Sequence, residues 1–292
     1  MQSLLPKNCT KLYNSHLIAD NISNPRQLWK TINNLLHRSA IPSLPNLSSV
    51  TSTAQQFANF FSGKVTKLRT SIPSVNQSPH SPQPPHSPPK LTELRPTDID
   101  EITKLVLQSP TKQCELDPIP TSLVKQSISV LAPIITNIIN LSLSSGTFPS
   151  SFKLSVVTPL LKKPNLDKNN FSSYRPISNL SFLSKLTERV VKDRISAHLS
   201  NNSLFNTFQS AYIPFHSTES VLLSLYDSII RAISKQQVTC LCLLDLSAAF
   251  DTIDHSILIH RLSSWFGIEN TALSWFQSYL SSHSFTAACG NT

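Results

Sequence analysis

The stretch that decides the fold is Val238-Thr239-Cys240-Leu241-Cys242-Leu243-Leu244-Asp245-Leu246-Ser247-Ala248-Ala249-Phe250-Asp251. An apolar run of strand length ends on an acid, and an aromatic residue follows five positions later. Because a continuous apolar run is typical of a strand buried on both faces, residues 238–245 are predicted to form a central strand. Asp245, at the end of that strand, is a candidate metal ligand. The alternative is that it only caps a turn.

Charge is unevenly distributed along the 292 residues, whose net charge is +9. Residues 151–200 carry 9 basic and 3 acidic residues, whereas residues 201–292 carry 3 basic and 6 acidic ones. A basic block beside an acidic block is expected where phosphate and a divalent metal meet, although ordinary solvated faces give the same pattern. The positive excess favours a polyanionic partner.

The first 90 residues differ in composition from the rest. Residues 1–70 are basic, with amphipathic helices predicted over residues 25–36 and 53–68. Residues 71–90 repeat Pro-His-Ser-Pro and are predicted to be a flexible Pro-rich linker, with a docking motif for a proline-reading domain as the alternative. We therefore place a domain boundary near Leu91, followed by a larger domain over residues 91–292.

Cysteine usage and hydropathy indicate an intracellular protein, in the cytoplasm, the nucleus or both. The five cysteines have no metal-binding or disulfide spacing and are predicted to be free thiols. No signal peptide is apparent, and the apolar stretch over residues 130–143 is too short and too polar to span a bilayer. We expect no membrane partner.

The larger domain alternates helical and strand patterns, which predicts an α+β fold. One helix is expected to begin at the cap Thr97, and another at Thr121, running to about Leu143 before the stop at Gly146. Strands are predicted over residues 154–164 and 174–179. Further helices are predicted around residues 183–191, 216–235 (with Thr218 as cap), 255–265 and 270–280.

Five segments in register resemble the reverse transcriptase of LINE-type (non-LTR) retrotransposons. They are Leu160-Leu161-Lys162-Lys163-Pro164, Tyr174-Arg175-Pro176-Ile177-Ser178-Asn179, Phe208-Gln209-Ser210, Leu244-Asp245-Leu246-Ser247-Ala248-Ala249-Phe250-Asp251 and Trp275-Phe276-Gln277-Ser278-Tyr279-Leu280. The resemblance covers roughly residues 95–285. It implies part of a polymerase right hand, mostly helical with a small incomplete sheet. Residues 95–235 would be mostly fingers and 236–292 the start of the palm. Residues 1–90 resemble the segment that precedes the polymerase in such polyproteins.

The resemblance implies an RNA-directed DNA polymerase that uses Mg²⁺. Asp245 matches the first metal-binding aspartate, and the Leu246 carbonyl would also face a metal. Phe250 matches the residue that stacks under the incoming sugar. The partners implied are an RNA template, a DNA primer and deoxynucleoside triphosphates, with no obligate protein partner evident.

Four further residues match positions that contact nucleotide or nucleic acid. Arg175 matches a fingers arginine that grips the triphosphate, since a planar guanidinium binds phosphate through two parallel bonds. Lys162 or Lys163 would assist it, and Gln209 lies in a motif expected to contact nucleic acid.

Each assignment has a structural alternative. Phe250 would then be core, Arg175 a surface ion-pair partner, and the two lysines solvated hairpin charges. Residues Asp251 and Asp254 are expected to cap a helix rather than bind metal. His255 and His260 are assigned no role, and Cys240 and Cys242 are expected to pack within the strand.

Two departures from the family pattern affect the expected activity. The adjacent Asp pair and the Pro-Gln-Gly-Ser-type loop of the family palm do not occur in these 292 residues, and Glu269 is the only acid after Asp254. Residues 211–218 read Ala-Tyr-Ile-Pro-Phe-His-Ser-Thr, where the family shows Gly-Phe-Arg-Pro-Gly-His-Ser-Thr. We therefore expect a fragment of a decayed element that is inactive alone and leaves apolar surface uncovered. The alternative function is a catalytically silent, basic nucleic-acid-binding remnant.

Overall fold

The computed structural model of the chain describes residues 15–16, 18–20, 24, 27–29, 31–32, 45, 50–71, 88–112, 114–246, 249–250 and 252–289. These residues fall into two compact units, which we describe separately. The smaller unit includes Pro159–Arg175, and the larger includes Ala54–Thr158 and Pro176–Ala288. Most of the predicted Pro-rich linker and much of the first predicted helix lie outside the described residues.

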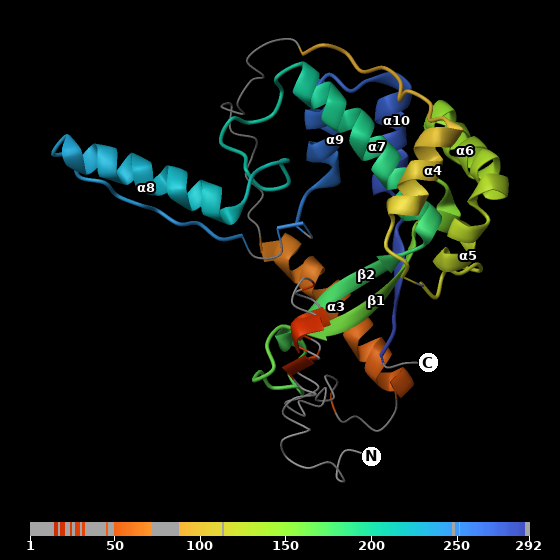
Figure 1. The fold of residues 1–292 in the computed structure, drawn as a ribbon, viewed down its shortest axis with the longest axis horizontal. Coiled ribbons are helices and arrows are strands. Elements are labelled where there is room, and N and C mark those ends of the chain that lie inside the picture. The colour runs from red at the N-terminus through yellow and green to blue at the C-terminus, as the bar shows by residue number, and fades with distance from the viewer. Residues whose placement is uncertain are drawn as a thin grey trace, which may run out of the picture. The chain divides into compact units, whose positions relative to one another are not determined.

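Helices make up most of the described secondary structure (Figure 1). They are α3 (Val50–Ser71), α4 (Ile99–Gln108), α5 (Thr121–Gln126), α6 (Ile128–Ser145), α7 (Phe182–Asn201), α8 (Thr218–Ser234), α9 (His255–Ser264) and α10 (Asn270–Leu280). The strands are β1 (Leu154–Leu161), β2 (Tyr174–Leu180) and β3 (Ser284–Ala287), in the sheet order β2-β1-β3. Strands β1 and β3 run parallel, with Leu154 opposite Ser284 and Val157 opposite Ala287.

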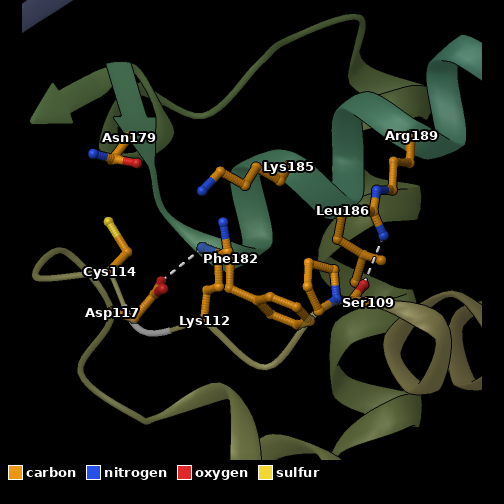
Figure 2. Close-up of a pocket in the computed structure, with 10 residues that line it drawn as sticks. Ser109, Lys112, Cys114, Asp117, Asn179, Phe182, Lys185, Leu186 and Arg189 are labelled. Atoms are coloured by element: carbon orange, nitrogen blue, oxygen red, sulfur yellow. Dashed lines mark hydrogen bonds between the residues drawn. The ribbon is translucent and has the colours of Figure 1, made fainter. Parts of the chain in front are cut away.

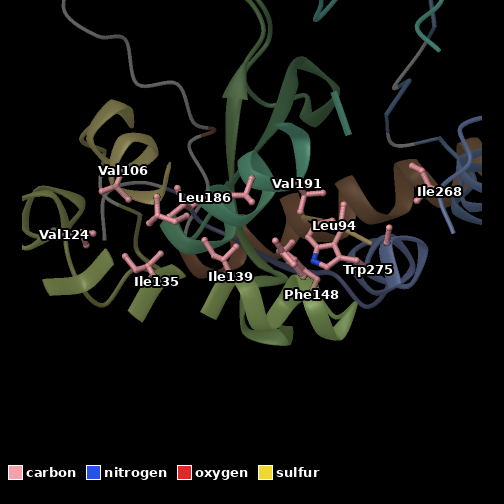
Figure 3. Close-up of a cluster of buried hydrophobic side chains, with 14 residues drawn as sticks. Leu94, Val106, Val124, Ile135, Ile139, Phe148, Leu186, Val191, Ile268 and Trp275 are labelled. Carbon is pink, nitrogen blue, oxygen red and sulfur yellow. The ribbon is translucent and has the colours of Figure 1, made fainter. Parts of the chain in front are cut away.

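The core of the larger unit is built from one face of each of several helices (Figure 3). Its buried residues are Leu94, Ile102, Val106, Val124, Ile135, Ile139, Leu143, Phe148, Leu186, Val190, Val191, Ile268, Ala272 and Trp275. The Trp275 ring meets Phe148 edge to face at 5.4 Å, and its indole N–H donates to Ser142 Oγ at 3.0 Å. The one polar atom of the indole is thus satisfied inside an apolar cluster.

Helix α6 is fixed at its C-terminal end by its cap and by Asn140. Gly146 ends the helix with φ +64°, and its N–H donates to Leu143 and Ser142 carbonyls. A Cβ at Gly146 would lie 2.9 Å from the carbonyl oxygen of Thr271, so this close approach also requires glycine. Farther back, Asn140 exchanges two hydrogen bonds with the backbone of Thr97, at 2.8 and 2.9 Å.

A buried ion pair joins α7 to α4. The Arg194 guanidinium is almost fully buried, binds both carboxylate oxygens of Glu101 and also donates to the Arg95 carbonyl at 3.1 Å. The hydrogen bond from Arg194 lowers the pKa of Glu101, and burial opposes this effect. Thr97 donates to the same carboxylate at 2.9 Å.

Most predicted elements of the larger domain are confirmed, with small shifts at their caps. The N-cap of α4 is Asp98 rather than Thr97, and that of α8 is Ser217 rather than Thr218. Asp254 caps α9, as predicted, by accepting from the N–H groups of Ser256 and Ile257. The helix predicted from Thr121 is interrupted at Ser127, which separates α5 from α6.

The predicted central strand is wrong. Residues 238–245 form no strand and are exposed, with Val238 at 99% and Leu244 at 88% of full exposure. A strand is stable only when a neighbour completes its hydrogen-bond ladder, and no strand within the described residues pairs with this segment. Cys240 and Cys242 are accordingly exposed free thiols rather than packed side chains. The predicted uncovered apolar surface is confirmed here.

One described helix, α6, has the length and apolar composition that could cross a membrane. Its buried residues Ile135, Ile139 and Leu143 belong to the core cluster, and the helix contacts both α4 and α10. A core helix passes the same test of length and composition, and the packing identifies α6 as one.

Candidate functional site

Asp245 lies in the exposed apolar segment after α8. Its Oδ1 accepts the backbone N–H of the next residue, Leu246, at 3.0 Å. Leu246 is itself exposed, while Ser247, Ala248 and Asp251 lie outside the described residues. The structure therefore places the candidate acid on an accessible stretch, with a local turn-type hydrogen bond.

The described donor set does not fit the metal that the resemblance implies. No group of three or more His, Cys, Asp and Glu side chains able to hold a metal ion occurs in the part of the chain that the structure describes. Two-metal sites use several carboxylates to hold both ions, and Asp245 supplies one. The described residues alone therefore supply too few ligands for a two-metal site.

The candidate phosphate-binding residues lie around the connection between β1 and β2. The Lys162 backbone N–H donates to the Ser173 carbonyl at 2.9 Å, and its Nζ donates to the Ser172 carbonyl at 2.7 Å. Arg175 and Lys163 are exposed and take part in none of the ion pairs among the described residues. The ion-pair alternative for Arg175 is thus unsupported, and both side chains are accessible to an anion.

These three cations belong to the smaller unit, whereas Asp245, Leu246, Phe250 and Gln209 belong to the larger one.

The loop that precedes α8 carries exposed aromatic side chains. Gln209 folds back on this loop, its Nε2 donating to the Ala211 carbonyl at 2.9 Å. Phe250 is 74% exposed, so it is not a core residue, and its ring meets Tyr212 edge to face at 6.5 Å. Gln209, Tyr212 and Phe250 thus lie on one accessible part of the larger unit.

Two residues of this loop have left-handed backbone conformations. Tyr212 and Phe215 both have φ near +64°, a region that residues with a Cβ rarely adopt. Phe215 is the position where the family pattern carries its second glycine. The loop therefore keeps the backbone turn that glycine favours although the glycine has been replaced.

A basic cavity in the larger unit escaped the sequence reasoning (Figure 2). Three cationic side chains, Lys112, Lys185 and Arg189, line it together with one carboxylate, Asp117. Its α7 wall consists of residues 182, 185, 186 and 189, which is one face of a helix at i, i+3, i+4 and i+7. That periodic pairing of basic with apolar residues was the available sequence signal.

Comparison with known proteins assigns the segment that carries the candidate site. Residues 161–291 match the family model described as reverse transcriptase (RNA-dependent DNA polymerase). All seven candidate residues named above, from Lys162 to Phe250, fall inside that span.

Several similar proteins from Drosophila are named RNA-directed DNA polymerases. The chain is 26% identical over 178 residues to the "Probable RNA-directed DNA polymerase from transposon BS" of Drosophila melanogaster, covering 59% of this chain and 19% of that protein. It is 25% identical over 202 residues to the corresponding X-element protein of the same fly, covering 69% of this chain and 21% of the relative. For the "RNA-directed DNA polymerase from mobile element jockey" of Drosophila funebris, identity is 26% over 170 residues, covering 58% of this chain and 18% of the relative.

The chain thus spans about a fifth of the length of these relatives. The motifs, the family match and the transposon relatives agree with one another. Residues 161–291 of the chain therefore match the reverse transcriptase family model, and the resemblance to LINE-type (non-LTR) reverse transcriptases is confirmed.

Proposed function

We propose that the chain is a segment of an RNA-directed DNA polymerase that supplies the fingers and the start of the palm of a right-hand fold. The observation that carries this proposal is the family match over residues 161–291, which contains every candidate site residue. The small sheet and the surrounding helices support it. The proposed substrates are an RNA template, a DNA primer and deoxynucleoside triphosphates.

Within that proposal, Arg175 grips the triphosphate of the incoming nucleotide, assisted by Lys162 or Lys163. The guanidinium is exposed and free of ion pairs within the described residues, so its parallel N–H donors are available to phosphate oxygens. Phe250 offers an exposed ring to the sugar, and Gln209 contacts the nucleic acid. Asp245 is the acid that would bind divalent metal once further carboxylates are supplied.

A second candidate function is nucleic-acid binding without nucleotide transfer. A two-metal site uses several carboxylates, and the described residues contain no group of three or more His, Cys, Asp and Glu side chains able to hold a metal ion, which supports this second function. The basic block over residues 151–200 supplies charge for binding phosphate backbones. For the 292-residue polypeptide itself, we propose binding of primer–template with no extension.

Primer extension separates the two functions. The 292-residue chain would be incubated with a DNA primer on an RNA template, deoxynucleotides and Mg²⁺, beside its Asp245→Asn variant. A matched control is Asp193→Asn, which neutralises an exposed acid on α7. We expect salt-dependent binding by all three proteins and incorporation by none.

Incorporation that Asp245→Asn abolishes and Asp193→Asn preserves would overturn the proposed inactivity and establish polymerase activity in this chain. Absence of binding at low salt would contradict both functions, because each requires contact with nucleic-acid phosphates.

A further inference from the structure

The basic cavity lies between the end of α4 and the first turns of α7 (Figure 2). Its volume is about 110 Å³, which is room for several water molecules or one phosphate group. Ser109 and Leu186, both at least 95% buried, form part of its wall. The cavity is therefore a built recess whose cationic side chains project from well-packed backbone.

The charges of the cavity are not balanced by protein. The three ion pairs among the described residues include none of Lys112, Lys185 and Arg189. The one carboxylate in the wall, Asp117, is engaged elsewhere, because its Oδ1 accepts the backbone N–H of Phe182 at 2.7 Å. Like charges that share a recess repel one another, and a bound anion would relieve that repulsion.

Hydrogen bonds fix the backbone of Lys112 and orient the guanidinium of Arg189. The Lys112 backbone N–H donates to the Pro110 carbonyl at 2.9 Å, and the Lys112 carbonyl accepts from Thr121 Oγ1 at 2.9 Å. Arg189 donates one N–H to Ser109 Oγ at 2.7 Å. The remaining guanidinium N–H groups make no other hydrogen bond among the described residues, so they are available to a ligand.

A purely structural role explains part of this arrangement. Cations stabilise the carbonyl end of a helix, and Arg189 lies beside Ser109, the C-cap of α4. That task is already performed by Lys125, whose Nζ donates to the Leu107 carbonyl at 3.0 Å and also to the Ser109 carbonyl. Stabilisation of α4 therefore leaves Lys112 and Lys185 unexplained.

We propose that this cavity binds a phosphate group of a nucleic-acid strand, through Lys112, Lys185 and Arg189. The class of ligand, a nucleic acid, rests on the proposed function. The location of the binding site rests on the cavity alone. Two flexible ammonium groups and one planar guanidinium suit a phosphodiester, which presents oxygens in several directions. Asn179 adds a neutral amide at the rim. Because a backbone phosphate carries no base, this contact positions a strand without reading its sequence.

Salt-dependent binding measures the number of phosphates engaged. The probe is a labelled single-stranded RNA of roughly 12 nucleotides, within the length one binding groove covers. Lys112→Gln/Lys185→Gln is expected to reduce the magnitude of the slope of log affinity against log salt by about 0.7, since the cavity holds one phosphate and each phosphate contact on a single strand contributes about that much. The control Lys104→Gln/Lys192→Gln removes two exposed lysines, one on α4 and one on α7, that do not line the cavity, and it should keep the wild-type slope.

Acetylation of lysines, read by mass spectrometry, locates the contact. The RNA probe should protect Lys112 and Lys185 of the wild-type chain but leave Lys104 and Lys192 reactive. Circular dichroism of both double variants should match wild type, because all four lysines are exposed.

Equal slopes for the two double variants would overturn the inference while leaving the proposed function intact. Failure of the wild-type chain to bind the RNA at low salt would overturn the proposed function. A parallel experiment uses inorganic phosphate alone in place of RNA. If phosphate protects Lys112 and Lys185 but RNA does not, the cavity is a site for a free anion and not for a nucleic-acid strand.

Discussion

Helices α6 and α8 are both rich in apolar side chains, but only α6 buries them. Six residues of α6 are buried, four of them apolar, whereas no residue of α8 is buried. The apolar segment that follows α8, through Leu246, is exposed as well. A local pattern thus suffices to form a helix, while burial requires a second element that presents a matching surface.

The difference follows from what each region contacts. Helix α6 packs against α4 and α10, and polar links at Asn140 and Ser142 fix its register. In α8 the polar interactions join residues of the same helix or its cap, such as the capping box between Ser217 and Ser220 and the exposed ion pair between Arg231 and Asp227. Exposed pairs of this kind contribute little to stability. We expect the two regions to respond very differently to equivalent substitutions.

The largest expected loss of stability comes from truncating a side chain in the core. Trp275→Ala would remove a nearly fully buried indole that packs on Phe148 and leave Ser142 without its donor. We expect a loss of about 3–5 kcal/mol in the free energy of unfolding. The counterpart in the exposed region, Leu244→Ala, should change it by less than about 0.5 kcal/mol. Urea titration measures both, and equal losses would refute the contrast.

The next effect concerns the ion pair between α7 and α4. Arg194→Met would leave the partly buried Glu101 carboxylate without its cation, at a cost of about 3 kcal/mol at neutral pH. Arg231→Met, which breaks the exposed pair on α8, should cost under about 0.5 kcal/mol. A comparable loss from both variants in the same urea titration would show that α8 is part of the cooperative core.

The same pair makes stability depend on pH. Because the folded-state pKa of Glu101 is lowered from 4.5, its contribution is complete above that value and is lost as the pH falls through the folded pKa. Glu101→Gln should therefore flatten the acid limb of the stability curve below about pH 4.5. Thermal unfolding from pH 3 to 7 tests this, and an unchanged acid limb would contradict the assigned role.

Helix caps provide a smaller comparison. Asp98 caps α4 in the core region by accepting the Glu101 N–H at 2.7 Å, and Asp98→Ala should cost about 1 kcal/mol of global stability. Ser217→Ala removes the equivalent cap of α8. It should lower helix content by circular dichroism without moving the midpoint of global unfolding. A shifted midpoint for Ser217→Ala would mean that α8 unfolds together with the core.

The smallest expected effect is a gain in stability, in the loop that precedes α8. Phe215 has φ +64°, so Phe215→Gly should relieve backbone strain and stabilise the loop by roughly 0.5 kcal/mol after the entropy of the unfolded chain is subtracted. Phe208→Gly, at an exposed residue of the same loop without a positive φ, should be neutral or destabilising. The change in unfolding temperature relative to wild type should therefore be positive for Phe215→Gly and zero or negative for Phe208→Gly.

What the sequence predicted well was local. Gly146, Asp254 and the acidic first turn of α4 act within one helical turn, so most helix ends were placed to within a few residues. The strand at 238–245 was wrong because an apolar run specifies a strand only when a partner exists. Strand β3 has only four residues, too few for its alternation of polar and apolar residues to be recognised, and it pairs with the edge that β1 offers to Ser284–Ala287. Lys112 and Lys185 lie far apart in the sequence, so only the fold could bring them to one cavity.

Among the described residues no strand pairs with the segment that carries Asp245, whereas α6, α7 and α10 contribute to a packed helical core. Hydrogen exchange followed by mass spectrometry tests this contrast most directly. We predict slow exchange in α6, α7 and α10, and exchange at the rate of unstructured chain in residues 238–246. Protection of residues 238–246 comparable to that of α6 would contradict the account, because it would require the paired central strand that the structure lacks among its described residues.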